Sequence, residues 1–135
     1  GWRCSEEVRR LTAGDPAELR WLNYVPDKDL PVILGLSSAL IFPSLGEGFG
    51  LPILEAFAAG TAVIASNTTS LPEVAGDAAL LVDPTDREAL TNAMLRISED
   101  GGLVQTLRSL GSERARTFSW ERTAAATLRS YRKVL

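Results

Sequence analysis

A glycine-rich turn between two apolar segments is the feature that most constrains this chain. The run ALIFPS (residues 39–44) is typical of a strand that is buried in a parallel sheet. Three glycines follow within residues 46–50, and Pro52 then opens a segment, residues 52–59, that ends in front of Gly60. Proline suits the first turn of a helix and glycine suits the position after its end. The order strand, turn, helix predicts an α/β unit with this turn at the carboxyl end of a strand.

The rest of the chain repeats this alternation of strand and helix. We predict strands at residues 19–25, 39–44, 61–66 and 78–82, and helices at residues 5–15, 27–37, 52–59, 86–98, 103–117 and 119–135. Pro31 is expected in the first turn of the second of these helices. No repeat, linker or low-complexity segment interrupts the order. We therefore predict a single α/β domain built on a parallel sheet.

The last predicted helix carries an apolar stripe on a basic segment. The stripe, more typical of core packing than of a ligand-binding surface, consists of Trp120, Ala124, Leu128, Tyr131 and Leu135. Residues 108–135 hold 7 basic and 2 acidic side chains, whereas residues 1–107 hold 7 basic and 15 acidic ones. The basic segment fits a solvated helix, a contact with another domain, or peripheral contact with an anionic membrane surface. The acidic remainder argues against nucleic acid as a partner.

Composition excludes several kinds of chemistry within these 135 residues. The chain has no histidine and one cysteine, Cys4, which excludes a histidine base, a Ser–His–Asp triad, an internal disulfide and a cysteine-based zinc site. No apolar run reaches the roughly 20 residues of a membrane span, and the first residues lack a signal-peptide pattern. Together with the lone cysteine, these features lead us to expect a cytoplasmic location.

Two glutamates, Glu47 and Glu55, accompany the glycine-rich turn. Free N–H groups and the positive end of the helix dipole favour a phosphate there, whereas a carboxylate repels phosphate and accepts hydrogen bonds from hydroxyl groups. A nucleotide-diphosphate sugar satisfies both: its phosphates would meet the helix, its transferred sugar Glu47, and its ribose Glu55 on the first helical turn. Gly48 and Gly50 would let the backbone approach this ligand and allow positive φ, and Phe49 would form one wall.

Each of these residues also has a purely structural interpretation. Glu55 suits any helix N-terminus, where a carboxylate contributes about 0.3–1 kcal/mol. Gly48 and Gly50 suit a tight turn, and Gly60 suits a helix C-cap. Only the whole set favours a ligand site.

The stretch PSLGEGFGLPILEAFAAGTAVIAS (residues 43–66) resembles the nucleotide-sugar-binding signature of retaining group 1 (family 4) glycosyltransferases, which have the GT-B fold. The segments YVPDKDLPVILGLSSALIFPS (24–44), SLPEVAGDAALLVDP (70–84) and LRSLGSERARTFSWERTAA (107–125) resemble consecutive parts of the same enzymes. The resemblance covers nearly all of the chain. It implies a Rossmann-like parallel sheet with helices on both faces.

The resemblance also implies roles for individual residues. Glu47 would be the catalytic residue that contacts hydroxyls of the donor sugar near the reacting carbon, and Glu55 would hold the ribose. The donor-binding loop would comprise Gly48, Phe49, Gly50 and Leu51, whose backbone meets the sugar and diphosphate. Val25 and Pro26 would lie beside the nucleobase. Gly46 departs from the pattern, because an aromatic residue often precedes the first glutamate.

For the reaction, the resemblance implies transfer of a sugar with retention of its configuration by front-face substitution, without a metal or other cofactor. Such enzymes have two Rossmann-like domains. Residues 1–135 are accordingly expected to be a partial C-terminal donor-binding domain that lacks its first strands, its upstream Arg and Lys, and the N-terminal acceptor domain. We expect the isolated chain to have no measurable transferase activity. Two alternatives stay open: a non-catalytic nucleotide-sugar-binding module, and a sugar-nucleotide epimerase or phosphorylase-type relative of the same fold.

The absent strands leave the strand at 19–25 without its usual neighbours. Because unpaired backbone groups in a core are costly, we expect this segment to pair elsewhere, to slide across the gap, or to pair with a second copy. The chain is therefore expected to be rearranged locally or to form a homodimer through its exposed edges. The faces of the last helix are expected to be exposed.

Overall fold

A computed structural model of the chain describes Arg9, Ala13 and residues 19–134. It divides into two compact units, Gly1–Leu30 and Pro31–Leu135. The predicted helix at residues 5–15 lies outside the described residues, apart from Arg9 and Ala13.

The predicted strand at residues 19–25 is wrong. These residues have neither helical nor strand structure, and Asn23 has a φ of 56°, a left-handed value that interrupts an extended run. The side chains of Trp21 and Leu22 are about half exposed, at 47% and 46%. A strand needs a partner to satisfy its backbone groups, and no described strand pairs with this segment. The apolar pattern alone therefore did not produce a strand.

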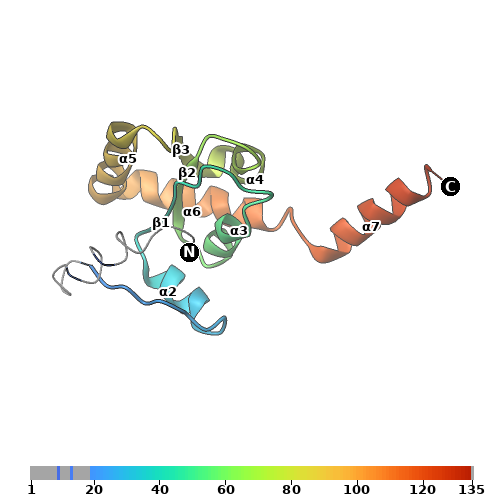
Figure 1. Cartoon of the computed structure of the whole chain (residues 1–135), viewed down its shortest axis with the longest axis horizontal. Helices are drawn as coiled ribbons and strands as arrows, with labels where there is room; N and C mark the ends of the chain where they lie inside the picture. Colours follow the sequence, from blue (N-terminus) through green and yellow to red (C-terminus); the bar gives the residue numbers. More distant parts are fainter. Residues whose placement is uncertain (1–8, 10–12, 14–18, 135) are drawn as a thin grey trace. The chain divides into compact units, whose positions relative to one another are not determined.

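The second unit is built on a three-stranded parallel sheet (Figure 1). Its strands are β1 (Ala39–Phe42), β2 (Ala62–Ser66) and β3 (Ala79–Val82), in the order β1-β2-β3. β2 lies in the centre and all its residues are buried, as predicted for a parallel-sheet strand. β1 ends two residues before the predicted boundary, because Pro43 has no N–H group to donate to a ladder.

Helices cover both faces of this sheet, which confirms the predicted architecture (Figure 1). They are α3 (Leu51–Ala58), α4 (Leu71–Ala75) with the 3₁₀ turn η1 (Gly76–Ala78), α5 (Arg87–Glu99) and α6 (Gly101–Ala115). On one face, side chains of α5 and α6 form a core with Ala62, Ile64 and Val82. Strand side chains alternate, so Val63 and Ala65 point to the other face, where α3 and α4 contact β2.

α3 is fixed by close packing along its buried stripe. Ile53, Ala56 and Phe57 recur at helical spacing and are at most 1% exposed. Each large apolar side chain buried in this way contributes about 1.5–3 kcal/mol. Gly111 of α6 lies against the ring of Phe57, and a Cβ there would fall 2.5 Å from Phe57 Cδ1. This close approach requires glycine at position 111.

α3 ends as its sequence predicts. Gly60 has a φ of 73° and donates its N–H to the carbonyl of Phe57 at 3.1 Å. The N–H of Thr61 reaches the carbonyl of Ala56 at 2.9 Å, which completes a Schellman motif. The interpretation of Gly60 as a C-cap residue is confirmed.

α2 (Leu30–Leu36) starts three residues later than predicted, and Pro31 lies in its first turn as expected. The carbonyl of Pro26 accepts hydrogen bonds from Asp29 and Leu30 in the turn that opens the helix. Leu34 is buried, and its carbonyl accepts a 2.6 Å hydrogen bond from the buried hydroxyl of Thr61.

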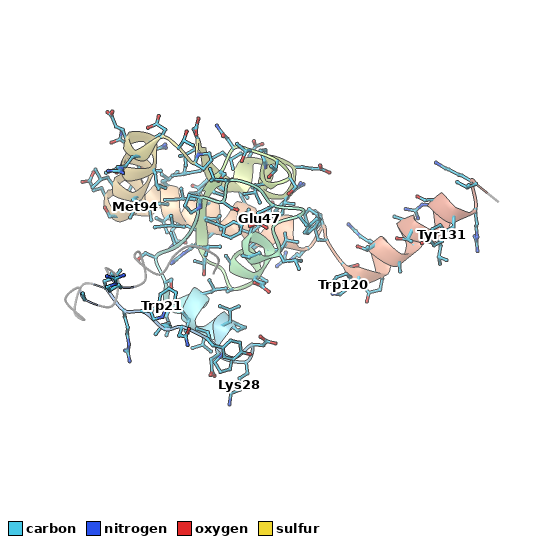
Figure 2. All side chains as sticks on the ribbon, in the orientation of Figure 1. Trp21, Lys28, Glu47, Met94, Trp120 and Tyr131 are labelled. Carbon is cyan, nitrogen blue, oxygen red and sulfur yellow. The ribbon has the colours of Figure 1, made fainter. Side chains whose placement is uncertain are left out.

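The last helix, α7 (Trp120–Tyr131), has no buried residue, so the expectation of core packing for its stripe is wrong and the expectation of exposed faces is confirmed. Trp120, Leu128 and Tyr131 are 77%, 56% and 63% exposed. Figure 2 labels Trp120 and Tyr131 on this helix. In the part of the chain that the structure describes, no helix is both long and apolar enough to span a bilayer.

Candidate functional site

The candidate site lies where β1 and β2 end. Residues 43–50 follow β1 and residues 67–70 follow β2. Both strands run the same way, so these loops share one edge of the sheet, the edge at which α/β proteins bind ligands. The loops are joined directly, because the N–H of Glu47 donates to Thr69 Oγ1 at 3.3 Å.

Glu47 is held at three points (Figure 2 labels the residue). Its carboxylate oxygen Oε1 accepts a 2.9 Å hydrogen bond from the hydroxyl of Ser44. Its N–H donates to Thr69, and its carbonyl accepts from Ser70 Oγ at 3.0 Å. The residue is partly buried, and Oε2 makes no hydrogen bond with the described part of the chain. A carboxylate with one fixed and one free oxygen is suited to accept a hydrogen bond from a ligand hydroxyl.

The position of Ser44 is itself fixed by the core of the sheet. Ser66, the last residue of β2, is fully buried, and its hydroxyl donates to the carbonyl of Ser44 at 2.6 Å. Buried hydroxyl groups are costly without a partner, so this hydrogen bond anchors the first part of the loop to the central strand.

The glycines of the turn have different roles. Gly50 has a φ of 107°, and a Cβ there would lie 2.6 Å from Leu71 Cδ2, so the fold itself requires glycine. Gly48 has no positive φ, and a Cβ at this position would meet no atom within 4 Å. The prediction of a left-handed conformation thus holds at Gly50 and not at Gly48. The fold leaves open space beside Gly48.

The loop also presents unused backbone donors. Within the described residues, the N–H groups of Gly48, Phe49, Gly50 and Leu51 donate no hydrogen bond, and Pro52 has no N–H. The N-cap residue of α3 is Gly50, which has no side chain to cap the helix. Consecutive free N–H groups at a helix N-terminus form a favourable environment for an anion such as phosphate.

Glu55 lies one position further from the start of α3 than predicted, and therefore just beyond the first turn. It is the fifth residue of the helix, which has no acidic residue in its first turn. The favourable effect of the helix dipole falls off within that turn, so the structural interpretation of Glu55 loses its main support. The side chain is exposed and makes no hydrogen bond with described residues. It is free to bind a ligand.

Phe49 packs against a residue that the site prediction missed. Its ring meets that of Phe118 edge-on, with centroids 5.9 Å apart and an interplanar angle of 83°. The guanidinium of Arg114 lies over the Phe118 ring at 5.1 Å, and its Nε donates to the carbonyl of Val74 at 3.0 Å. The glycine-rich loop is therefore braced by the segment between α6 and α7.

An apolar pocket of about 200 Å³ lies beside the contact between Phe49 and Phe118. It is lined by Phe49, Leu51, Leu54, Phe118, Ser119, Trp120 and Thr123. Neither Glu47 nor Glu55 contributes to it. Its mostly apolar lining does not suit a diphosphate or a sugar, but Phe49 and Leu51 belong both to this pocket and to the predicted donor-binding loop.

Val25 and Pro26 belong to the first compact unit, whereas the glycine-rich turn belongs to the second. Val25 is partly buried, and the carbonyl of Pro26 is used in the turn before α2. Their role beside a nucleobase stays a prediction. Among the described residues, no cluster of three or more His, Cys, Asp or Glu side chains is placed to hold a metal ion.

Sequence reasoning missed four side chains that shape the site: Ser44, Thr69, Ser70 and Phe118. It also missed α4, although Ser70, Pro72 and Glu73 have the residue types and spacing of a typical helix start. That signature was available in the sequence. The contacts of Thr69, Ser70 and Phe118 with the loop join distant residues and have no local signature, whereas Ser44 lies three positions before Glu47.

Comparison with known proteins gives a consistent result. The sequence model of the family described as "Glycosyl transferases group 1" matches residues 5–116. The O-antigen chain mannosyltransferase B of Escherichia coli is 43% identical over 114 residues, which cover 84% of this chain and 30% of that protein. The phosphatidyl-myo-inositol mannosyltransferase of Mycolicibacterium smegmatis is 35% identical over 136 residues, which cover 98% of this chain and 35% of that protein.

A solved structure gives the same picture. The sucrose-phosphate synthase of Thermosynechococcus elongatus matches with a TM-score of 0.82 and 32% identity, over 98% of this chain and 33% of that one. The predicted α/β fold of GT-B type is thereby confirmed. The chain spans about a third of the length of these relatives.

Proposed function

The chain belongs to the group 1 glycosyltransferase family, and on that premise we propose that it forms the donor-binding region of an enzyme that transfers a sugar from a nucleotide-diphosphate sugar. One observation carries this proposal. Four consecutive N–H groups without acceptors stand beside a carboxylate, Glu47, that is fixed at three points. The first feature suits a diphosphate and the second suits a sugar hydroxyl.

The diphosphate would bind at the start of α3. The N–H groups of residues 48–51 would donate to its oxygens, and the open space beside Gly48 would admit it without a clash. As the bond to the nucleotide breaks, negative charge grows on these oxygens. Donors that are already in place stabilise such charge without reorganisation. We propose that this stabilisation requires no metal ion.

Glu47 would act on the transferred sugar. Its free oxygen Oε2 would accept a hydrogen bond from a sugar hydroxyl and orient the reacting carbon, and its negative charge would favour the positive character of that carbon in the transition state. Glu55 would hold the ribose. We propose front-face substitution with retention, in which the acceptor attacks from the side that the nucleotide leaves. The chain supplies no histidine for this chemistry.

Mannose is the donor sugar to test first, because the two relatives described above are named mannosyltransferases. The base of the nucleotide would be selected by the segment that contains Val25 and Pro26. GDP-, UDP- and ADP-linked mannose and glucose form a suitable panel, since they vary the base and the sugar separately.

The direct test is a titration of the chain with this panel, followed by NMR of the amide groups of Gly48 to Leu51. Selective shifts for one donor, weakened at least tenfold in Glu55→Ala, are the expected result. Glu99→Ala is the matched control, because Glu99 is an exposed glutamate of another helix, α5. A well-dispersed spectrum without shifts for any donor would overturn the proposal.

A second experiment separates an enzyme from a binding module. We expect the isolated chain to bind its donor without measurable transfer, because acceptors would bind a separate domain. Sugar transfer by a longer form that includes such a domain, lost in Glu47→Ala, supports the transferase. Donor binding with no transfer in the longer form would favour the non-catalytic module, and interconversion of the donor sugar would favour the epimerase.

Among the described residues, α7 has no buried side chain and β1 is an edge strand of the sheet. Trp120 and Tyr131 are exposed on α7, and Ile41 of β1 is 39% exposed. A homodimer through exposed edges and peripheral contact with an anionic membrane stay predictions. Light scattering tests the first, and sedimentation with anionic vesicles tests the second.

A further inference from the structure

We propose that three hydroxyl side chains, Ser44, Thr69 and Ser70, are positioning residues that direct the Glu47 carboxylate toward the donor sugar, an inference that rests on the proposed function. This hydroxyl cluster meets Glu47 at its carboxylate, its N–H and its carbonyl. The members come from two loops, after β1 and after β2. Glu47 is thus held between two neighbouring strands and not by its own loop alone.

Ser44 selects which carboxylate oxygen faces the ligand. Its hydroxyl has one hydrogen, and the contact with Glu47 Oε1, at 2.9 Å, is much shorter than that with the carbonyl of Gly46, at 3.4 Å. The hydrogen therefore goes to Oε1 and leaves Oε2 for a sugar hydroxyl. The buried hydroxyl of Ser66 fixes the backbone of Ser44. The direction of the Glu47 carboxylate therefore depends on the core of the sheet.

Ser70 reaches the glycine-rich loop instead of capping its own helix. Ser70 and Glu73 have the spacing of a capping box, yet the Ser70 side chain makes no cap hydrogen bond with α4. Its hydroxyl lies 3.0 Å from the carbonyls of both Glu47 and Phe49, which share its single hydrogen. The side chain best suited to stabilise α4 thus holds the loop of Glu47 in place.

Thr69 occupies an unfavourable backbone conformation. Its φ is 55°, a left-handed value that β-branched residues rarely adopt and that costs free energy. Glycine would adopt this conformation without that cost. What threonine supplies in return is the hydroxyl that accepts the N–H of Glu47. Such strain is common where a residue serves a site.

The test compares binding of the full 135-residue chain to a nucleotide-sugar and to the same nucleoside diphosphate without sugar. Glu47 would touch only the sugar, so Ser44→Ala should weaken binding of the nucleotide-sugar about tenfold and leave the nucleoside diphosphate unchanged. Ser44→Thr keeps the hydroxyl and should bind the nucleotide-sugar with the affinity of the wild type. Ser98→Ala is the matched control, because it removes a serine hydroxyl that donates to a carbonyl within α5.

Equal weakening of both ligands by Ser44→Ala would overturn the inference, because it would indicate general damage to the loop. A chain that binds neither ligand would overturn the proposed function. In that case the ¹³C resonance of the Glu47 carboxylate decides the inference: it should move in Ser44→Ala and return in Ser44→Thr. An unmoved resonance would overturn it.

Thr69→Gly provides an independent test of the same proposal. Removal of the strain should raise the thermal midpoint or leave it unchanged, while loss of the hydroxyl should weaken the nucleotide-sugar at least threefold relative to the nucleoside diphosphate. Thr69→Ser, which keeps the hydroxyl, should bind like the wild type. If Thr69→Gly binds both ligands like the wild type, Thr69 is not a positioning residue.

Discussion

The helices α3 to α7 begin in two different ways. α5, α6 and α7 each start with a side chain that caps its own backbone: Asp86 accepts from Ala89 N at 2.9 Å, Asp100 from Leu103 N at 2.8 Å, and Ser119 from Arg122 N at 3.2 Å. α3 and α4 have no such cap. Gly50 has no side chain, and Ser70 turns to the loop of Glu47.

Among α3 to α7, the helices without a side-chain cap are the two that follow β1 and β2, at the candidate site. A side-chain cap contributes about 0.5–2 kcal/mol relative to alanine, which is lost at α4, whereas a glycine at the N-cap, as at α3, costs only about a few tenths of a kcal/mol. In exchange, the start of α3 keeps N–H groups that donate to no described residue, and Ser70 holds the glycine-rich loop. Among these five helices, side-chain capping is therefore present away from the site and absent at it.

Gly50→Ala should have the largest effect on stability. The added Cβ meets Leu71 Cδ2 at 2.6 Å, and alanine is strained at a φ of 107°. Together these should lower the free energy of unfolding by about 3 kcal/mol, measured by urea denaturation. Gly46→Ala, where a Cβ meets no atom within 4 Å, is the control. Equal stability of the two variants would contradict the role assigned to Gly50.

Asp100→Ala should have an intermediate effect on the free energy of unfolding, and it tests the helices that have a side-chain cap. Loss of the hydrogen bond to Leu103 N should cost about 1 kcal/mol in the same assay. Donor binding should be unchanged, because α6 starts away from the loops that follow β1 and β2. A loss of donor affinity comparable to that of Glu55→Ala would break the comparison.

Gly48→Ala should change stability by less than about 0.5 kcal/mol, because its Cβ enters open space and its φ is not left-handed. We nevertheless expect donor affinity to fall at least tenfold, because that space would receive the diphosphate. Denaturation and donor titration together test this separation. Unchanged affinity would show that Gly48 serves only the turn.

Asp83→Asn should have the smallest effect on stability. It extends the comparison to the loop after β3. The hydroxyl of Thr85, and then its N–H, lower the pKa of Asp83 below its usual value. A lowered pKa stabilises the fold above the unfolded pKa, and this contribution is lost as the pH falls through the folded pKa. The wild type should therefore lose slightly more stability than Asp83→Asn between about pH 6 and pH 3. Matched urea titrations measure this difference, and donor affinity should not change.

Elements with local signatures were predictable from the sequence. α3 carried a proline in its first turn, an apolar stripe and a terminal glycine, and β2 was a short run of apolar residues between turns. The segment 19–25 also had an apolar pattern, yet a strand requires a partner, and partners are not encoded locally. Pattern alone therefore gave one strand too many.

The candidate site was predictable only in part. Glu47 and the glycines stand in one stretch of sequence, so their chemistry could be considered together. Two of the three hydroxyls that hold Glu47, those of Thr69 and Ser70, come from residues that are 22 and 23 positions away. Their contribution depends on how β1 and β2 pair, which sequence periodicity does not reveal.

The register between β1 and β2 therefore sets the relative positions of the two loops that form the site. Phe42 lies opposite Ala65, and this register places the residues after β1 beside those after β2. A slip of one residue would move one loop along the other by about 3.3 Å and would turn the side chains of the slipped strand to the other face. Any substitution that shifts this register, even one buried far from the loops, would move the hydroxyl groups that position Glu47 and change the direction of its carboxylate.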